Sequence, residues 1–526
     1  MKNRLNIKKQ KLATIAAVTK KQKFISNTQI TSVLEQVIHP YDRLVIEGDN
    51  QKQASFLVNA LNQVSNKIVN HLSLVIPSVE LKAELDLFEN GIASSLDFAF
   101  AGPQSAHLAE LINQKQLTVN NIHTYLELYG RLFVDLIPDV ALIIGMQADL
   151  QGNLYLAENT EETPILVEAT ATKFGIVIAQ VNEIVDQLPR IDIPADQVDL
   201  IVTSDHPEQP YPLFTKDPQN ITHEQILAAM LAIKGIYGKY KVKTLNHGIG
   251  YNTAAIELIL PTYGSQLGLK HQIATNWVNN PTPTLIPAIE AGWIESIYCF
   301  GGEAGMEKYI AAHPEIFAVD HHFNLKSNRV FAQIAGQYAI DMFVGSTLQI
   351  DHLGNASTIT ANRLSGFGGA PNMGSNPHGR RHLTPPYQKF GNRKLVVQLA
   401  NSRRWNHEPV FVENLDAMKI KNNVNVDPIM IYSHDTTHIV TENGIANLYK
   451  TTSPTEKKMA IEAIAGNTSI GNLCSSAQRR NLQAQGLITT LEDLNIHSEQ
   501  ATSNLLAARS INDLIKCSKG LYQPKH

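Results

Sequence analysis

The sequence predicts an α/β protein made of two tandem, open α/β domains with largely parallel sheets, followed by a helical C-terminal extension. Apolar runs of strand length alternate with helical patterns over most of the 526 residues, as in parallel sheets that are covered by helices. A chain of this length favours two or three domains. Apolar residues make up 43% and charged residues 17% of the chain, which suits a packed interior and excludes a disordered protein.

The first half contains short apolar runs with the character of buried strands, separated by helical patterns. The expected strands are Leu44–Glu47, Leu72–Ile76, Val140–Met146 and Ile176–Val181, and the clearest helices are Ala54–Val64 and Ala106–Ile112. A stretch with two prolines, Leu188–Pro194, then marks a boundary, because proline interrupts both helices and strands.

The second half continues in the same style. Thr222 and Gln225 form a capping-box pattern ahead of a helix at Ile226–Ile233. Further expected elements are a helix at Thr253–Leu260 and strands at Ile297–Phe300 and Phe343–Ile350. From about Thr455 a leucine-rich amphipathic pattern predicts packed helices. We therefore expect a basic N-terminal arm (1–35), a first domain (36–195), a second domain (196–454) and a helical extension (455–526).

The N-terminal arm carries eight Lys or Arg residues between Met1 and Lys23, and the first acidic residue is Glu35. The apolar run Leu12–Val18 is interrupted by Thr14, and no small-residue cleavage site follows it at the proper distance. We therefore expect a mobile or surface-docked arm rather than a signal peptide.

The composition excludes several classes of function. The formal charge of −4 gives no general attraction to nucleic acid or anionic lipid. The cysteines Cys299, Cys474 and Cys517 are few, odd in number and far apart, which disfavours a disulfide framework or a zinc site. No apolar run approaches the roughly 20 residues that a membrane helix needs. The sequence thus predicts a cytoplasmic protein that binds no metal, nucleic acid or membrane.

A short pattern occurs once in each half. An apolar strand is followed by Asp149-Leu-Gln-Gly-Asn153 in the first half and by Asp351-His-Leu-Gly-Asn355 in the second. Asp, Gly and Asn favour tight turns, so one such turn carries little information. Two of them after similar strands suggest a duplicated α/β domain, with coincidental turn chemistry as the alternative.

Two glycine-rich loops are the strongest candidates for ligand binding. The first is Ser365–Gly374 with the following Gly379–His382, and the second is Leu245–Asn252 ahead of the Thr253–Leu260 helix. Glycines let the backbone approach a ligand, and consecutive N–H groups form an anion-binding nest or an oxyanion hole. Neither loop has a Walker or Rossmann pattern. An ordinary glycine-rich connection is the structural alternative.

The order of motifs resembles CoA-transferases, with similar segments spread over about residues 40–450. These segments are Ile178–Asn182 with Leu188–Arg190, Val344–Asp351 with Gly354, Gly366–Asn372 and Val440–Ala446. The resemblance implies two tandem open α/β domains with the active site between them.

Within that superfamily the sequence is most similar to the alpha subunits of malonate decarboxylase, through Asn279–Trp293, Gly366–Arg381 and Ala507–Ser510. This resemblance implies that acetyl is exchanged for malonyl on the thiol of an acyl carrier protein. It also implies a dephospho-CoA-type prosthetic group on that carrier, no cofactor bound by this chain, and carboxyltransferase-like decarboxylase subunits as partners. Malonate and acetate would be the small ligands. A citrate lyase alpha-type transferase is the nearest alternative.

One segment departs from the wider superfamily. Ordinary CoA-transferases have a Glu nucleophile shortly after their Gly-Ile-Gly-type loop, but the corresponding segment here, Leu269–Asn280, contains no acidic residue. The resemblance therefore implies direct attack by the substrate carboxylate, with Asn276 or Asn279 as the orienting side chain. Asn276 is slightly preferred, and Glu303 or Glu442 would be the nucleophile if an acyl-enzyme formed.

The remaining site residues are assigned by their loops. Gly368, Gly369 and Ala370 are the expected oxyanion donors. Arg380 and Arg381 suit a carboxylate or a phosphate, because guanidinium groups bind both through paired hydrogen bonds. The other expected substrate-binding residues are Asn246, Gly248, Gly250, Gly366, Asn372, Glu442 and Asn443.

Two other classes of function stay open at this point. The missing Glu is compatible with a binding module that kept the fold and lost catalysis, although two intact glycine loops argue against that. A sugar-phosphate isomerase of similar topology leaves the duplication unexplained.

Overall fold

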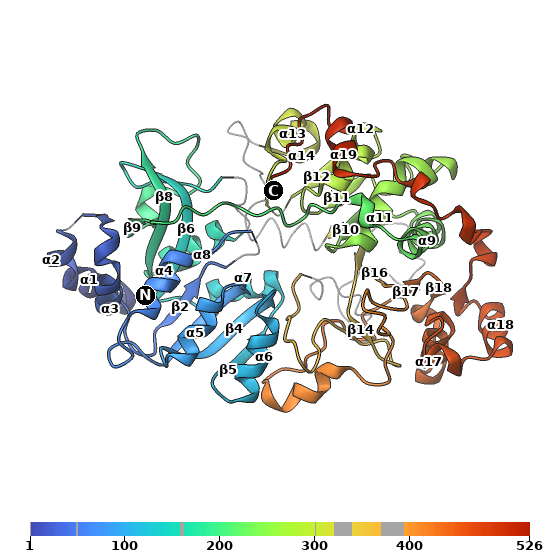
Figure 1. Cartoon of the computed structure of the whole chain (residues 1–526), viewed down its shortest axis with the longest axis horizontal. Coiled ribbons are helices and arrows are strands. Elements are labelled where there is room, and N and C mark those ends of the chain that lie inside the picture. The colour runs from blue at the N-terminus through green and yellow to red at the C-terminus, as the bar shows by residue number, and fades with distance from the viewer. Residues whose placement is uncertain are drawn as a thin grey trace.

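The structure is a computed structural model that describes residues 2–20, 22–48, 51–157, 162–299, 301–319, 339–369 and 394–525 (Figure 1). The first part of the chain, blue to green, forms one sheet with its helices, and the second part, green to red, forms another. No helix of the described residues is long and apolar enough to cross a membrane.

The first sheet has the strand order β1-β9-β8-β6-β2-β3-β4-β5 and is parallel along this path. Its strands are β1 (Phe24–Ile25), β2 (Arg43–Ile46), β3 (Leu72–Val79), β4 (Ala93–Ala101), β5 (Thr118–Ile122), β6 (Val140–Asp149), β8 (Ile176–Val185) and β9 (Leu200–Thr203). A short strand, β7 (Leu154–Tyr155), pairs antiparallel with β6. The strands expected in the first half are thus confirmed. The last of the sheet's strands in sequence, β9, lies just beyond residue 195.

Helices cover both faces of this sheet. Leu44 and Ile46 of β2 pack in one core with helices α3 (Ile30–Val37), α4 (Ser55–Asn62), α5 (Lys82–Glu89) and α6 (Ser105–Asn113). Val45, between them, packs in a second core with α7 (Tyr125–Val134) and α8 (Thr163–Thr172). Successive side chains of a strand point to opposite faces, so a continuous apolar run such as Leu44–Ile46 requires cover on both sides.

The basic N-terminal arm is docked on the first sheet. Its helix α1 (Lys2–Thr14) is followed by α2 (Ala16–Thr19). Arg4 and Lys8 lie 2.8 Å from Asp139 and Asp199, and Lys11 forms a third ion pair, with Asp42. Each of these aspartates directly precedes a strand of the sheet. The arm therefore covers the amino-end edge of the sheet.

The second sheet has the order β12-β11-β10-β13-β16-β17-β18-β19. It is parallel from β12 to β17 and antiparallel from β17 to β19. Its strands are β10 (Thr244–His247), β11 (Asn276–Val278), β12 (Ser296–Tyr298), β13 (Met342–Gly345), β16 (Leu395–Leu399), β17 (His438–Thr441), β18 (Gly444–Ala446) and β19 (Ile488–Thr489).

Helices of the second half confirm the sequence patterns. The capping box of Thr222 and Gln225 opens α9 (His223–Ala232), and α11 (Tyr251–Ile259) follows the Gly248–Gly250 loop. Smaller helices are α10 (Gly238–Tyr240), α12 (Ile286–Glu290), α13 (Glu307–Ala312) and α14 (Pro314–Phe317). The C-terminal region has α17 (Pro454–Ile464), α18 (Ser476–Ala484) and α19 (Ile511–Cys517), and it adds β19 to the sheet.

The strand expected at Phe343–Ile350 is wrong as a single element. β13 ends at Gly345, and Gln349–Ile350 forms β14, which pairs with β15 (Ala356–Ser357) in a separate two-stranded sheet. Between them the Thr347 hydroxyl donates to the carbonyls of Gln349 and Ser357, at 3.2 and 2.9 Å. These bonds fold the chain into a turn that apolar patterning does not reveal.

The repeated turns have the same hydrogen bonds. The Asp149 carboxylate accepts the Asn153 backbone N–H at 2.9 Å and the Asn153 side chain at 2.7 Å, and both bonds from Asn355 to Asp351 are 2.9 Å. Gly152 and Gly354 both have φ +88°. The two turns share this conformation but follow different elements, because Asp149 ends β6 of the first sheet and Asp351 follows β14 of the two-stranded sheet. The duplication therefore stays a prediction.

One stretch of the second half packs on the first sheet. Leu364, Leu415 and Ile420 belong to the same apolar core as the strands and helices of the first half. Asn423 donates to Asn113 at 2.8 Å, and the helical turn Asp416–Asn423, orange in Figure 1, lies beside α6 and β5. The two halves are therefore joined by buried apolar surface.

Candidate active site

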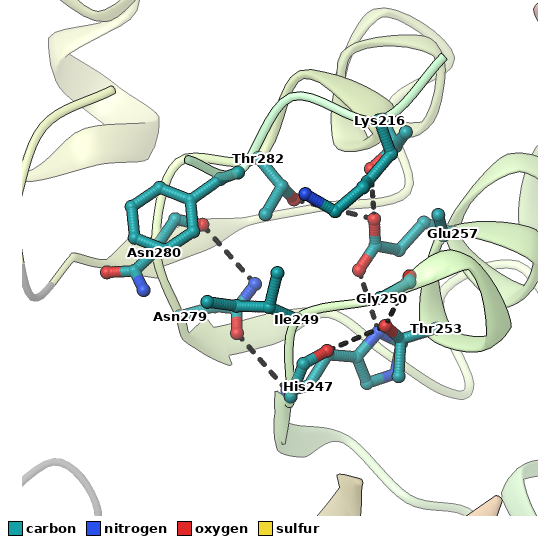
Figure 2. A pocket seen from close by; sticks show the side chains of 13 residues that line it. Lys216, His247, Ile249, Gly250, Thr253, Glu257, Asn279, Asn280 and Thr282 are labelled. Atoms are coloured by element: carbon teal, nitrogen blue, oxygen red, sulfur yellow. Dashed lines mark hydrogen bonds and ion pairs between the residues drawn. The ribbon is translucent and has the colours of Figure 1, made fainter. Parts of the chain in front are cut away.

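A pocket lies at the carboxyl ends of β10 and β11, where the Gly248–Gly250 loop leads into α11 (Figure 2). Parallel sheets commonly bind ligands at this edge, because loops and helix starts converge there. The described residues that line the pocket are Phe214, Lys216, His247, Gly248, Ile249, Gly250, Thr253, Ala254, Glu257, Asn279, Asn280, Thr282 and Thr284.

The Gly248–Gly250 loop is held in one conformation. Gly248 donates its N–H to the Val344 carbonyl at 2.8 Å, and Gly250 has φ +154°, which favours glycine. The Thr253 hydroxyl contacts the carbonyl oxygens of Gly248 at 2.6 Å and Gly250 at 3.0 Å. Both predicted glycines therefore line the pocket, on a loop that hydrogen bonds to Val344 and Thr253 hold in place.

Asn279 directly follows β11 and its amide faces this loop. Its Oδ1 accepts hydrogen bonds from the His247 N–H and from Asn246 Nδ2, both at 3.2 Å, and its Nδ2 donates to the Asn280 carbonyl at 3.3 Å. Asn246 also donates to the Val278 carbonyl at 2.5 Å and is buried behind the pocket. Asn246 thus positions Asn279.

Asn276, the slightly preferred candidate, lies at the other end of β11 and is absent from the pocket lining. It is three positions from Asn279 along the strand direction, about 10 Å at 3.3 Å per residue. Its amide contacts the Thr275 and Ser296 hydroxyls at 2.8 and 2.7 Å. Of the two asparagines, only Asn279 lies at the carboxyl edge of the sheet and lines the pocket.

A buried His–Glu pair forms the floor of the pocket, and the sequence patterns did not reveal it. His247 Nδ1 lies 2.9 Å from Glu257 Oε1, and Tyr237 Oη lies 2.5 Å from His247 Nε2. Glu257 Oε2 accepts the Thr284 hydroxyl and, at 3.4 Å, the Thr282 hydroxyl. Glu257 is the one carboxylate among the described lining residues. Both of its oxygens are already engaged.

Lys216 enters the pocket from the segment that links the two halves (Figure 2). Its ammonium donates to the carbonyls of Leu213 at 2.8 Å and Thr215 at 3.3 Å. Burial lowers the pKa of Lys216, and the negative charge of Glu303 acts in the opposite direction. No sequence motif identifies this lysine. It reaches the Gly248–Gly250 loop only through the fold of the chain.

Glu303 is fully buried and anchors that linking segment. It accepts the backbone N–H groups of Leu213, Phe214 and Thr215 at 2.9–3.1 Å, and Gln51 of the first half at 3.1 Å. Burial raises its pKa, against the lowering effect of these hydrogen bonds. Glu303 lies outside the described pocket lining, so its visible role is structural.

The predicted oxyanion loop docks on the first sheet. Phe367 and Gly368 donate their N–H groups to the Ala99 carbonyl at 2.8 and 3.0 Å, and Gly366 forms a bridge with Phe100. The Gly368 N–H is therefore engaged in this conformation. Gly366, Gly368 and Gly369 do not line the pocket. Ala370, Asn372, Arg380 and Arg381 lie outside the described residues, so their expected roles stay predictions.

Glu442 and Asn443 lie at the carboxyl end of β17, on the same edge of the sheet as the pocket. Three strand spacings separate β17 from β10, about 14 Å at 4.8 Å per spacing. Glu442 accepts the Ser402 N–H at 3.0 Å, the Ser402 hydroxyl, and Asn443 Nδ2 at 2.9 Å. Neither residue lines the pocket.

Comparisons with known proteins agree over the whole chain. The family "Malonate decarboxylase, alpha subunit, transporter" matches residues 1–526. The acetyl-S-ACP:malonate ACP transferase of Malonomonas rubra is 48% identical over 520 residues, which cover 96% of this chain and 94% of that protein.

Solved structures are similar as well. A chain of the Pseudomonas malonate decarboxylase hetero-tetramer in complex with malonate has a TM-score of 0.95 and 49% identity, covering 99% of this chain and 98% of that one. An acyl-CoA transferase of Escherichia coli, 13% identical with a TM-score of 0.51 over 79% of this chain and 86% of that one, shares the fold alone. The predicted CoA-transferase-like fold is confirmed, and the chain belongs to the malonate decarboxylase alpha subunit family.

Proposed function

We propose that this chain is an acyl-carrier-protein transferase that converts acetyl-S-carrier and malonate into malonyl-S-carrier and acetate. The activity named for the Malonomonas rubra relative is the same exchange. The observation that carries the mechanism is Asn279, which occupies the region where ordinary CoA-transferases have a Glu. An amide accepts no acyl group, but it donates and accepts hydrogen bonds.

The reaction follows two acyl-transfer steps without an acyl-enzyme. A malonate carboxylate oxygen attacks the acetyl thioester carbon, and the C–S bond breaks. The carrier thiolate departs, and an acetyl–malonyl anhydride is formed. The thiolate then attacks the malonyl carbonyl carbon of the anhydride. The C–O bond to that carbon breaks, acetate leaves with the bridging oxygen, and malonyl-S-carrier forms.

The pocket residues orient the reactants rather than supply a nucleophile. Asn279 is held by Asn246 and by the His247 N–H, so its amide is preorganised beside the Gly248–Gly250 loop. Glu257 is occupied by His247 and by the hydroxyls of Thr282 and Thr284, which leaves the incoming carboxylate as the attacking group. Preorganised donors of this kind accelerate acyl transfer, because they need no rearrangement when charge develops.

The partners follow from the carrier chemistry. The acyl group is carried on the thiol of a dephospho-CoA-type prosthetic group of an acyl carrier protein, and this chain itself binds no cofactor. Carboxyltransferase-like subunits then decarboxylate the malonyl thioester. The hetero-tetrameric Pseudomonas malonate decarboxylase supports such an assembly.

The test uses the purified chain with acetylated carrier and labelled malonate. We expect label on the carrier thiol, kinetics that require both substrates bound together, and no hydroxylamine-sensitive label on Glu257, Glu303 or Glu442. A control with non-acetylated carrier gives the background. Absence of transfer with competent carrier contradicts the activity, whereas ping-pong kinetics with a labelled glutamate contradicts only the direct mechanism.

A further inference from the structure

We infer that Lys216 is the specificity residue that binds the second, non-reacting carboxylate of the dicarboxylate substrate. This inference deepens the proposed function and rests on it. Arg380 and Arg381, which suit a carboxylate or a phosphate, lie outside the described residues. Lys216 instead belongs to the pocket that contains Asn279.

The backbone that carries Lys216 is rigidly placed. Its neighbours Phe214 and Thr215 donate their backbone N–H groups to the buried carboxylate of Glu303, at 3.1 and 2.9 Å. The Thr215 hydroxyl also donates to Glu303 at 2.8 Å and contacts the Tyr522 hydroxyl at 3.1 Å. The segment that carries this cation therefore has a fixed position relative to the pocket.

Among the described residues, the ammonium of Lys216 makes no direct ion pair or hydrogen bond with a carboxylate. Its hydrogen bonds go to the Leu213 and Thr215 carbonyls, and one of these is long, at 3.3 Å. An ammonium offers three N–H donors, so at least one is left for a ligand. The nearby negative charge of Glu303 acts on Lys216, but the hydrogen bonds of Glu303 go to the linking segment and to Gln51. An anionic ligand in direct contact with Lys216 therefore stabilises this partly buried charge further.

Glu257, the carboxylate among the described pocket residues, is not the ion-pair partner of Lys216. Glu257 lines the same pocket, but its hydrogen bonds go to His247, Thr282 and Thr284, and no ion pair joins it to Lys216. In Figure 2, Lys216 and Thr282 lie on one side of the pocket, and His247 and Thr253 lie on the other. We place the bound dicarboxylate between them, with one end at Lys216 and the other at Asn279, both of which line the pocket.

This arrangement distinguishes the substrate from the product. Malonate carries a second carboxylate, which gains a charge-assisted hydrogen bond to Lys216, whereas acetate has a methyl group at that place. Such bonds to charged groups are stronger than neutral ones and change affinity by about 10- to 100-fold. Lys216 therefore favours malonate over acetate without taking part in bond formation.

The experiment compares two exchange reactions of the same enzyme. Acetyl-S-carrier is incubated with labelled malonate or with labelled acetate, for the wild type, Lys216→Gln, Lys216→Arg and the control Lys241→Gln, which replaces an exposed lysine on the surface. We expect Lys216→Gln to raise the KM for malonate by about 10- to 100-fold and to change acetate exchange by less than about 3-fold. Lys216→Arg should restore most of the malonate preference.

The outcomes separate this inference from the proposed function. An equal loss for both acids, no loss for either, or a raised KM for the carrier alone overturns the role of Lys216. If the wild type transfers neither label, the proposed function fails, and calorimetric titration with malonate and its monomethyl ester still tests Lys216. The inference then requires that Lys216→Gln abolish the preference for the diacid, and equal binding of both compounds by the wild type contradicts it.

Discussion

At the scale of single residues, the pocket is built from polar groups that are already paired with one another. Glu257 is buried against His247, and Asn279 is buried against Asn246. Such pairing holds side chains in one geometry and keeps their desolvation cost low. Two lining residues differ. The hydrogen bonds of Lys216 go only to carbonyls of its own segment, and Asn280 Oδ1 has no hydrogen-bond partner among the described residues.

Asn276, which starts β11, and Asn279, which follows its end, provide a matched pair for testing the role of Asn279. We expect Asn279→Ala to lower the rate of acyl exchange by about 100- to 1,000-fold, the effect of losing one preorganised polar group in an acyl-transfer site. Asn276→Ala removes an amide at the other end of β11, about 10 Å away, and should change the rate by less than about 3-fold. Steady-state rates with acetyl-S-carrier and malonate measure both. An equal loss in the two variants contradicts the assignment.

At the scale of elements, the first turn of α5 contains a buried glutamate with a raised pKa. Glu84 in its first turn is fully buried and accepts the backbone N–H groups of Glu80 and Leu81, both at 2.9 Å. Burial outweighs these bonds and raises the pKa of Glu84 to about 8. Its Oε1 has no hydrogen-bond partner among the described residues, which suits a protonated carboxyl group.

This helix start makes stability depend on pH in a defined direction. The pKa of Glu84 is about 8 in the folded chain, against 4.5 for a solvent-exposed glutamate, so unfolding releases a proton between these two pH values. The unfolding free energy therefore falls as pH rises from about 5 to 8, by up to about 4 kcal/mol. In Glu84→Gln this contribution is absent. Urea unfolding at pH 5.5 and 8 should show a smaller loss for the variant, and parallel losses contradict the assignment.

The elements also show what sequence patterns reveal. The strands β2, β3, β6 and β8 were predicted because each is a continuous apolar run, buried on both faces. The break between β13 and β14 was missed, since the hydroxyl of Thr347 that turns the chain makes bonds to residues up to ten positions away. Likewise Lys216 and Glu257 carry no motif. They meet in the pocket because the segment that links the two halves, which carries Lys216, passes beside α11, which carries Glu257.

At the scale of the whole molecule, the second glycine-rich segment, residues 365–368, connects the two halves. Residues 365–368 of the second half run beside β4 of the first, and Arg363 donates to the Ser105 hydroxyl at 3.0 Å. A second connection joins Gln51 to Glu303, which also anchors the segment of Lys216. The pocket geometry is thus coupled to the contact between the halves, through contiguous hydrogen bonds.

The close approach at Gly366 makes this connection testable. A Cβ atom on Gly366, which has φ +77°, would lie 2.3 Å from the Ala99 carbonyl oxygen. That oxygen is the acceptor for both Phe367 and Gly368, so Gly366→Ala must displace the whole loop from β4. We expect a loss of about 2–3 kcal/mol in unfolding free energy, as for other strained or overpacked sites, together with slower acyl exchange.

Gly369→Ala is the matched control for stability, because a Cβ atom there meets nothing within 4 Å. Its unfolding free energy should stay within about 0.5 kcal/mol of the wild type, the usual range for surface changes. Denaturant titrations of the full chain measure both variants. If Gly366→Ala unfolds like Gly369→Ala, the loop does not hold the halves together. Any slower acyl exchange of Gly366→Ala must then have its cause in the pocket of the second half alone.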